Sequence, residues 1–129
     1  MLKPLSQKTI EKKYAELGLA KSKIELLHNW FLCFSNLYGV ISVKDAWRVF
    51  EHYEGYAVRK KDFVALSGIV QREANLPYSV FELKEIYSEE NDDPLERMIV
   101  NNKLLLPGYN RFIYVYAAVE RQGNKAYYH

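Results

Sequence analysis

Apolar residues recur at helical spacing through the first half of the chain. Residues 7–17 place Ile10, Tyr14 and Leu17 on one face with lysines opposite, which predicts a short amphipathic helix. The next stretch, residues 22–38, is apolar over so much of its circumference that it predicts a helix at the centre of the core. Its apolar positions are Ile24, Leu27, Trp30, Phe31, Cys33, Phe34, Leu37 and Tyr38.

Two more helices are predicted after Gly39, which suits a helix end because glycine adopts the left-handed conformation without steric cost. Ser42 is placed as an N-cap, with Asp45 at the capping-box position, for a helix over residues 43–53. A further helix spans residues 60–74. The residues expected to face inward on these two helices are Val43, Ala46, Trp47, Phe50, Tyr53, Phe63, Leu66, Ile69, Val70 and Ala74.

The pattern changes after Asn75, because Pro77 cannot continue a helix and residues 78–87 alternate loosely with a period of two. A polar acidic turn follows, and residues 98–107 contain an Asn101-Asn102 turn signal. The sequence therefore predicts a strand, a long acidic loop, and a returning strand or small hairpin.

Residues 110–122 carry conflicting signals. Their aromatic and β-branched run favours a strand, whereas Asn110 as a cap, two alanines and Gly123 as a stop favour a helix. Both structures stay open, and we expect the helix.

Together these elements predict a mainly α (α+β) fold: a compact helical bundle of helix-turn-helix type with a C-terminal β-hairpin as a wing, and a last helix. A length of 129 residues fits one domain. Within it, residues 1–20 hold the short N-terminal helix, residues 22–75 a tri-helical core, and residues 76–129 the hairpin and the C-terminal element.

Charge is unevenly distributed along the chain. Residues 1–23 carry six lysines and two glutamates, a net charge of +4, whereas residues 82–96 carry one lysine and seven acidic residues, a net charge of −6. Residues 97–129 return to +4. An acidic block of this size disfavours a protein that coats phosphate backbones nonspecifically, and it leaves specific nucleic-acid binding open.

Several classes of protein are disfavoured by what the sequence lacks. No apolar run reaches the roughly 20 residues that span a bilayer, and the N-terminus has no apolar segment of signal-peptide type. The single cysteine cannot form an internal disulfide. We therefore expect a cytoplasmic protein with no membrane partner.

Catalytic and metal-binding patterns are also missing. Cys33, His28, His52 and His129 are too scattered for a zinc site, and no nucleotide-binding, nucleophile-elbow or zinc-protease motif occurs. The acidic residues 89–93 lack the ligand spacing of a calcium loop. We expect no enzymatic activity, catalytic residue, metal or cofactor, with His28 partly buried and Cys33 in the core.

The order of parts resembles a poorly characterised family. The features that carry the resemblance are NLYGVIS followed by a capped helix, a helix with a basic start, a hairpin ending KLLLP, a further helix and a closing GNKAYYH. They resemble a winged-helix-like region of Gram-positive bacterial and mobile-element proteins, sometimes upstream of a SEC-C zinc motif. The resemblance covers roughly residues 24–129 and implies a fold. It brings no catalytic residue, and without a cysteine-rich segment it implies no zinc site here.

In a helix-turn-helix arrangement, residues 60–74 form the recognition helix and the following hairpin forms the wing. The outward stripe Lys61, Ala65, Gly68 and Arg72 is small in its centre and basic at its ends, which suits close approach to a groove. The same basic residues also fit an ordinary solvated surface. The candidate nucleic-acid contacts are Arg59, Lys60, Lys61, Gln71, Arg72, Lys84 and Lys103.

A protein-interaction module is the alternative function, for example a phage or mobile-element inhibitor that occupies a host protein. Acidic side chains and amphipathic tyrosines suit such a contact, although tyrosines also pack a last helix onto a core. The candidate protein contacts are Glu89, Glu90, Asp92, Asp93, Tyr114 and Tyr116. The first hypothesis remains a regulatory nucleic-acid-binding protein, and the sequence does not determine the oligomeric state.

Overall fold

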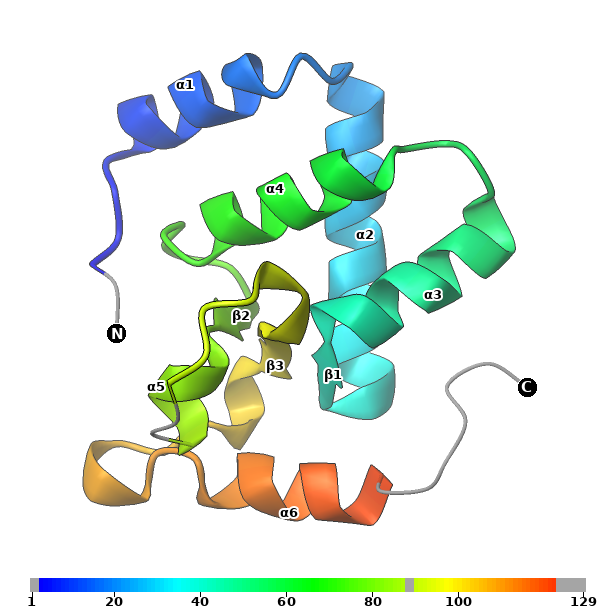
Figure 1. Ribbon diagram of the computed structural model, residues 1–129. Coiled ribbons are helices and arrows are strands. Elements are labelled where there is room, and N and C mark those ends of the chain that lie inside the picture. The colour runs from blue at the N-terminus through cyan, green and yellow to red at the C-terminus, as the bar shows by residue number, and fades with distance from the viewer. Residues whose placement is uncertain (1–2, 88–89, 123–129) are drawn as a thin grey trace.

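Four helices form where the apolar stripes predict them. The computed structural model describes residues 3–87 and 90–122. Its first helices are α1 (Gln7–Glu16), α2 (Lys21–Tyr38), α3 (Val43–Glu54) and α4 (Lys60–Val70), as Figure 1 shows. The predicted helices over residues 7–17, 22–38 and 43–53 are confirmed.

The predicted end of α2 at Gly39 and the predicted N-cap of α3 at Ser42 are also confirmed. Gly39 follows α2 with a φ of 75°, a backbone conformation that favours glycine. The Oγ atom of Ser42 accepts a hydrogen bond from the Asp45 N–H at 3.1 Å and caps α3. By contrast, α4 ends at Val70 and not at residue 74, because the chain already turns at residues 71–72.

A small antiparallel sheet joins the two halves of the chain. Its strands are β1 (Val40–Ser42), β2 (Tyr78–Phe81) and β3 (Met98–Asn101), in the order β1-β3-β2. The predicted strand, long loop and returning strand are therefore confirmed. The sequence did not predict β1, because three residues are too few for a period-two pattern and this strand depends on pairing with β3.

The rest of the second half consists of short helical elements. They are α5 (Leu83–Tyr87), α6 (Ile113–Gln122) and the 3-10 turns η1 (Pro94–Glu96), η2 (Asn102–Leu104) and η3 (Gly108–Asn110). The last helix is thus confirmed, although it begins later than Asn110.

Two predictions in this region are wrong. The strand signal does not extend beyond Phe81, because the Glu82 N–H donates to Oε1 of Glu85 at 3.0 Å and starts a helical turn. Asn101 does not begin a hairpin. Its Oδ1 atom accepts from the Lys103 N–H at 2.9 Å and starts η2.

The sheet separates two groups of buried side chains. Ile41, Val80 and Ile99 face the larger group, built with α2, α3 and α4, whereas Val40 and Val100 face α6. This alternation follows from the side-chain period of two in a strand. In Figure 1, α6 accordingly lies beneath the sheet, on the side away from α3 and α4.

Aromatic rings fill the larger group. The fully buried ring of Phe63 lies 5.3 Å from Phe31 of α2, 5.3 Å from Phe50 of α3 and 5.4 Å from Trp47, measured between ring centroids. Phe63 therefore contacts both neighbouring helices from its position on α4.

Four residues predicted to be inside lie on the surface. Leu37 is 75% exposed, Tyr53 is 59% exposed, and Cys33 and Ala74 are also exposed. Cys33 and Leu37 stand one turn apart, outside the arc of α2 that carries Phe31 and Phe34. The apolar stripe of α2 is therefore wider than the part of this helix that other elements cover. Within the described ranges, no helix has the length and apolar character needed to cross a membrane.

Replacing Phe63 by alanine should lower the free energy of unfolding by about 3–5 kcal/mol, since it leaves a cavity among three rings. Urea denaturation followed by circular dichroism measures the loss. Leu37→Ala is the control, because this exposed side chain should change stability by no more than about 0.5 kcal/mol. Equal losses in both variants would contradict the placement of Phe63.

Candidate functional site

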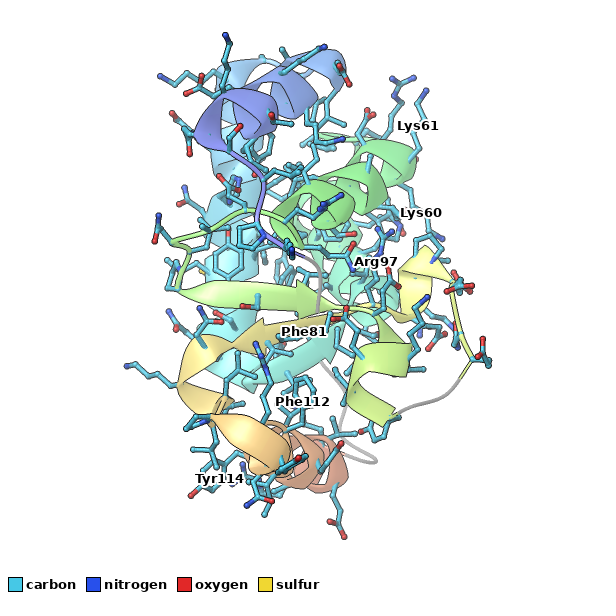
Figure 2. The ribbon with its side chains drawn as sticks, turned by 90° about the vertical axis from the view of Figure 1, so that its left-hand side faces the viewer. Lys60, Lys61, Phe81, Arg97, Phe112 and Tyr114 are labelled. Carbon is cyan, nitrogen blue, oxygen red and sulfur yellow. The ribbon has the colours of Figure 1, made fainter. Side chains whose placement is uncertain are left out.

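The start of α4 presents an exposed basic cluster. Arg59 is the N-cap residue, and Lys60 and Lys61 form the first turn, with all three exposed. The Arg59 Nε atom lies 3.3 Å from Oδ2 of the buried Asp62, whose carboxylate also offsets the helix dipole at this end. Lys60 and Lys61 project away from the core in Figure 2.

The other predicted nucleic-acid contacts do not join this cluster. Gln71 and Arg72 lie at the far end of α4, roughly 16 Å away at 1.5 Å per residue. Gln71 donates to Oε1 of Glu82 at 3.0 Å, and Arg72 donates to the Lys3 carbonyl at 3.3 Å.

Lys84 and Lys103 belong to different parts of the surface. Lys84 of α5 forms an ion pair with Asp92 at 2.8 Å, and this hydrogen bond raises the pKa of the lysine. Lys103 is exposed in η2, which packs against α6. The structure therefore brings together three of the seven predicted residues.

Arg97 covers the middle of α4. Its Nε atom lies 2.9 Å from Oε1 of Glu82, and its Nη1 atom donates to Oγ of Ser67 at 3.0 Å and to the Val64 carbonyl at 3.4 Å. A Cβ atom on Gly68 would lie 3.3 Å from the guanidinium. The predicted outward stripe is thus open at Lys61 and Ala65 and is covered at Gly68.

Residues 82–97 form the acidic connector between β2 and β3. Its η1 turn packs against both α3 and α4. Glu90, Asp92 and Asp93 are exposed, and Asp93 also caps η1 by accepting from the Leu95 N–H at 2.9 Å. Glu89 lies outside the described residues. In Figure 2, the connector lies on the same side of the molecule as Lys60 and Lys61, so this side carries both signs of charge.

Tyr114 and Tyr116, the two candidate protein contacts on α6, lie on different faces of this helix. The hydroxyl of Tyr116 donates to the Ile86 carbonyl, and its ring lies 5.3 Å from that of Tyr87, so it adjoins α5 at the beginning of the acidic loop. Tyr114 is 52% exposed and stands two residues earlier, about 200° around the helix. Figure 2 shows Tyr114 on the side away from α5.

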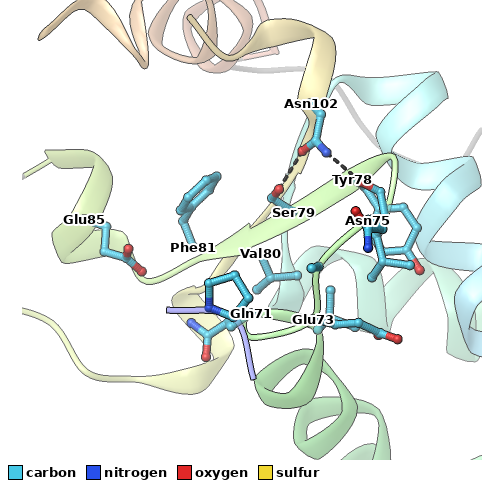
Figure 3. A pocket seen from close by; sticks show the side chains of 13 residues that line it. Gln71, Glu73, Asn75, Tyr78, Ser79, Val80, Phe81, Glu85 and Asn102 are labelled. Atoms are coloured by element: carbon cyan, nitrogen blue, oxygen red, sulfur yellow. Dashed lines mark hydrogen bonds between the residues drawn. The ribbon is translucent and has the colours of Figure 1, made fainter. Parts of the chain in front are cut away.

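A pocket of about 180 Å³ lies beside β2. Figure 3 shows Ser79 and Phe81 of β2, Glu73, and Asn102 along its wall, with the Ser79 hydroxyl donating to Asn102. Pro4 of the N-terminal segment also lines it. The volume is below the usual range of small-molecule sites, about 300 Å³ upward, and no lysine or arginine of the described chain lines it. It is therefore poorly suited to phosphate.

Four polar side chains near this pocket form a hydrogen-bonded chain, here called the His28 relay. Tyr14 of α1 donates its hydroxyl hydrogen to Glu73, and its oxygen lies 2.8 Å from Nε2 of His28. Because that hydroxyl has one hydrogen, Nε2–H of His28 must be the donor to Tyr14. Nδ1 is then the acceptor for the hydroxyl of Tyr78. With His28 neutral, each of the four side chains has a hydrogen-bond partner within the relay.

Burial sets the protonation of the relay. It lowers the pKa of His28, an effect that the carboxylate of Glu73 opposes, and it raises the pKa of both Tyr14 and Tyr78. The tyrosines thus keep their hydrogens at neutral pH. The sequence predicted a partly buried His28, which is confirmed, but its partners are 14, 45 and 50 residues away and no local signal identifies them.

Among the residues that the structure describes, no group of three or more His, Cys, Asp or Glu side chains is placed to hold a metal ion. No protein-family model, curated protein or solved structure matches this chain.

Arg97→Ala should lower the free energy of unfolding by about 3 kcal/mol, because it leaves Glu82 without its cation in a site where both side chains are mostly buried. Chemical denaturation measures the change. Arg121→Ala on the exposed face of α6 is the matched control and should cost less than about 0.5 kcal/mol. A loss below about 1 kcal/mol for Arg97→Ala would show that the connector does not depend on this ion pair.

Proposed function

We propose that this protein is a non-enzymatic, winged-helix-like nucleic-acid-binding protein with a regulatory role, and that it contacts a duplex through the first half of α4. The observation that carries the proposal is the exposed basic cluster Arg59, Lys60 and Lys61, followed one turn later by the small exposed Ala65. A helix start with these properties can approach phosphates closely.

The order of elements supports the proposal. A strand separates α2 from α3, α4 follows after a short turn, and β2, the acidic connector and β3 complete an antiparallel sheet in the order β1-β3-β2. In a winged-helix arrangement, α4 is the recognition helix and the connector takes the place of the wing. The connector folds against α3 and α4 through η1.

The distribution of charge on this side of the protein restricts how a duplex could bind. The connector carries most of the chain's acidic block on the same side as the basic cluster, so it repels a phosphate backbone that lies across the whole face. A duplex is therefore held over a short contact by a few cations, which favours a specific site over nonspecific coating.

The double variant Lys60→Ala and Lys61→Ala should weaken binding to its preferred duplex. The loss of two phosphate contacts should make the slope of log affinity against log salt shallower by about two. Selection from a random duplex pool at low salt, followed by fluorescence anisotropy at several salt concentrations, provides the measurement.

The matched control removes the same charge elsewhere, through Lys8→Ala and Lys12→Ala, at two exposed positions on α1. It should leave the slope within about half a unit of the parent protein. Absence of binding to every duplex pool at low salt, or equal weakening by the control, would refute the proposal.

The alternative is a protein-interaction module, such as a phage or mobile-element inhibitor of a host protein. The exposed carboxylates of Glu90, Asp92 and Asp93 favour it, since their connector adjoins the half-exposed ring of Tyr116. A basic protein partner would complement this surface, and Tyr116 would add the amphipathic contact area typical of binding hot spots.

This alternative predicts a host protein that copurifies after nuclease treatment. Glu90→Gln, Asp92→Asn and Asp93→Asn together keep size and hydrogen bonding but remove three charges, and they should abolish the capture. Glu11→Gln and Glu16→Gln on the exposed face of α1 are the control and should retain it. A partner that remains bound after the connector is neutralised would exclude the acidic contact.

A further inference from the structure

We propose that residues 3–17, the N-terminal arm, form a strap over the pocket beside β2, held closed by the neutral His28 relay and loosened when His28 gains a proton. This inference is independent of nucleic-acid binding. It rests on the attachment of the arm to the rest of the fold at two points.

The first attachment fixes the extended part of the arm. The Leu5 N–H donates to the Arg72 carbonyl at 2.8 Å, and Arg72 Nε donates to the Lys3 carbonyl at 3.3 Å. Between them, Pro4 lines the pocket. Proline offers no backbone N–H to the exposed edge of a sheet, so it shields β2 without extending the ladder.

The second attachment is the relay. Tyr14 contributes its hydroxyl from α1, and the remaining members come from α2, β2 and the turn after α4. Figure 1 shows α1 alongside α4 at the edge of the fold, with the chain before it running down one side. Of the relay's members, Tyr14 alone belongs to the arm.

The arm buries fewer side chains than the helix beneath it, α2. α1 has one fully buried side chain, Ile10, whereas α2 buries Leu27, Phe31 and Phe34 in the main core. Tyr14 and Leu17 of the arm are only partly buried against the core, so lifting the arm exposes less apolar area than displacing α2 would, and it admits water to His28.

Protonation of His28 destabilises the closed position of the N-terminal arm. With hydrogens on both nitrogens, Nδ1–H of His28 becomes a donor to the Tyr78 oxygen, and the hydroxyl hydrogen of the buried Tyr78 is left without its acceptor. The imidazolium must also remain in a partly buried site beneath α1. The titratable groups that face His28 are Tyr14, Tyr78 and Glu73, and the Glu73 carboxylate offsets part of this cost.

The direction of the pH effect follows from these contacts. Burial lowers the pKa of His28 in the closed state below its ordinary value of 6.5, which the ring regains when the arm lifts and water reaches it. Closure is therefore fully favoured above about pH 6.5 and weakens as the pH falls below that value.

Hydrogen exchange measured by mass spectrometry at pH 8 and pH 5, corrected for intrinsic rates, tests the strap. Opening of residues 7–16 should rise by up to about tenfold for each pH unit that separates the pKa of His28 in the two states. Residues 43–54 of α3 should not change. Equal increases in α1 and α3, or no increase in α1, would overturn the proposal.

Two variants distinguish a pH effect that acts through the relay from a general effect of acid on the stability of the protein. His28→Gln keeps a donor and an acceptor but gains no proton, so opening of α1 should become independent of pH. His52→Gln on the exposed surface of α3 should leave the pH dependence intact. A pH dependence that persists in His28→Gln would assign it to another group.

A reciprocal measurement does not depend on the stability of the His28 variant. Ile10→Ala loosens the arm without touching the relay, so the pKa of His28 should rise toward its ordinary value in an NMR titration. An unchanged pKa of His28 in Ile10→Ala would show that closure of the arm and the protonation of His28 are not coupled.

Discussion

The ion pair between Arg97 and Glu82 is the interaction on which the arrangement of the second half depends. It joins the two ends of the acidic connector, and through Ser67 and the Val64 carbonyl it attaches them to α4. Both side chains are mostly buried, and Oε2 of Glu82 has no hydrogen-bond partner in the described chain, so the contact of Oε1 with Arg97 is what offsets the burial of the Glu82 charge. Gly68 provides the space, so Arg97 can cross α4 closely.

The same contact decides which part of α4 is exposed. Arg97 covers the helix at Gly68 and leaves its basic first turn open, while the connector brings carboxylates to the same side. Under the proposed function, charge of both signs on one face would give selectivity, because it penalises partners that do not match it. The relay beneath α1 lies apart from this face and controls a different region.

Much of the fold was readable from local patterns, whereas the candidate site was readable only in part. Ser42 and Gly39 fix their helix ends through bonds and backbone angles within a few residues, and the stripe of α3 predicts most of its buried face. Arg59, Lys60 and Lys61 are neighbours in sequence and remain neighbours in space. Gln71 and Arg72 were expected on the same surface, but distant residues bind both side chains.

The sequence by itself determined the first four helices, the presence of the β2 and β3 strands and the basic start of α4, because these depend on periodicity, capping and adjacency. Only the tertiary structure decided that residues 40–42 form a strand, since three residues become one by pairing with β3. The tertiary structure also decided which side chains bind His28 and that Arg97 covers α4 at Gly68. Those contacts join residues far apart in the chain, and burial and hydrogen bonding across such distances leave no local pattern.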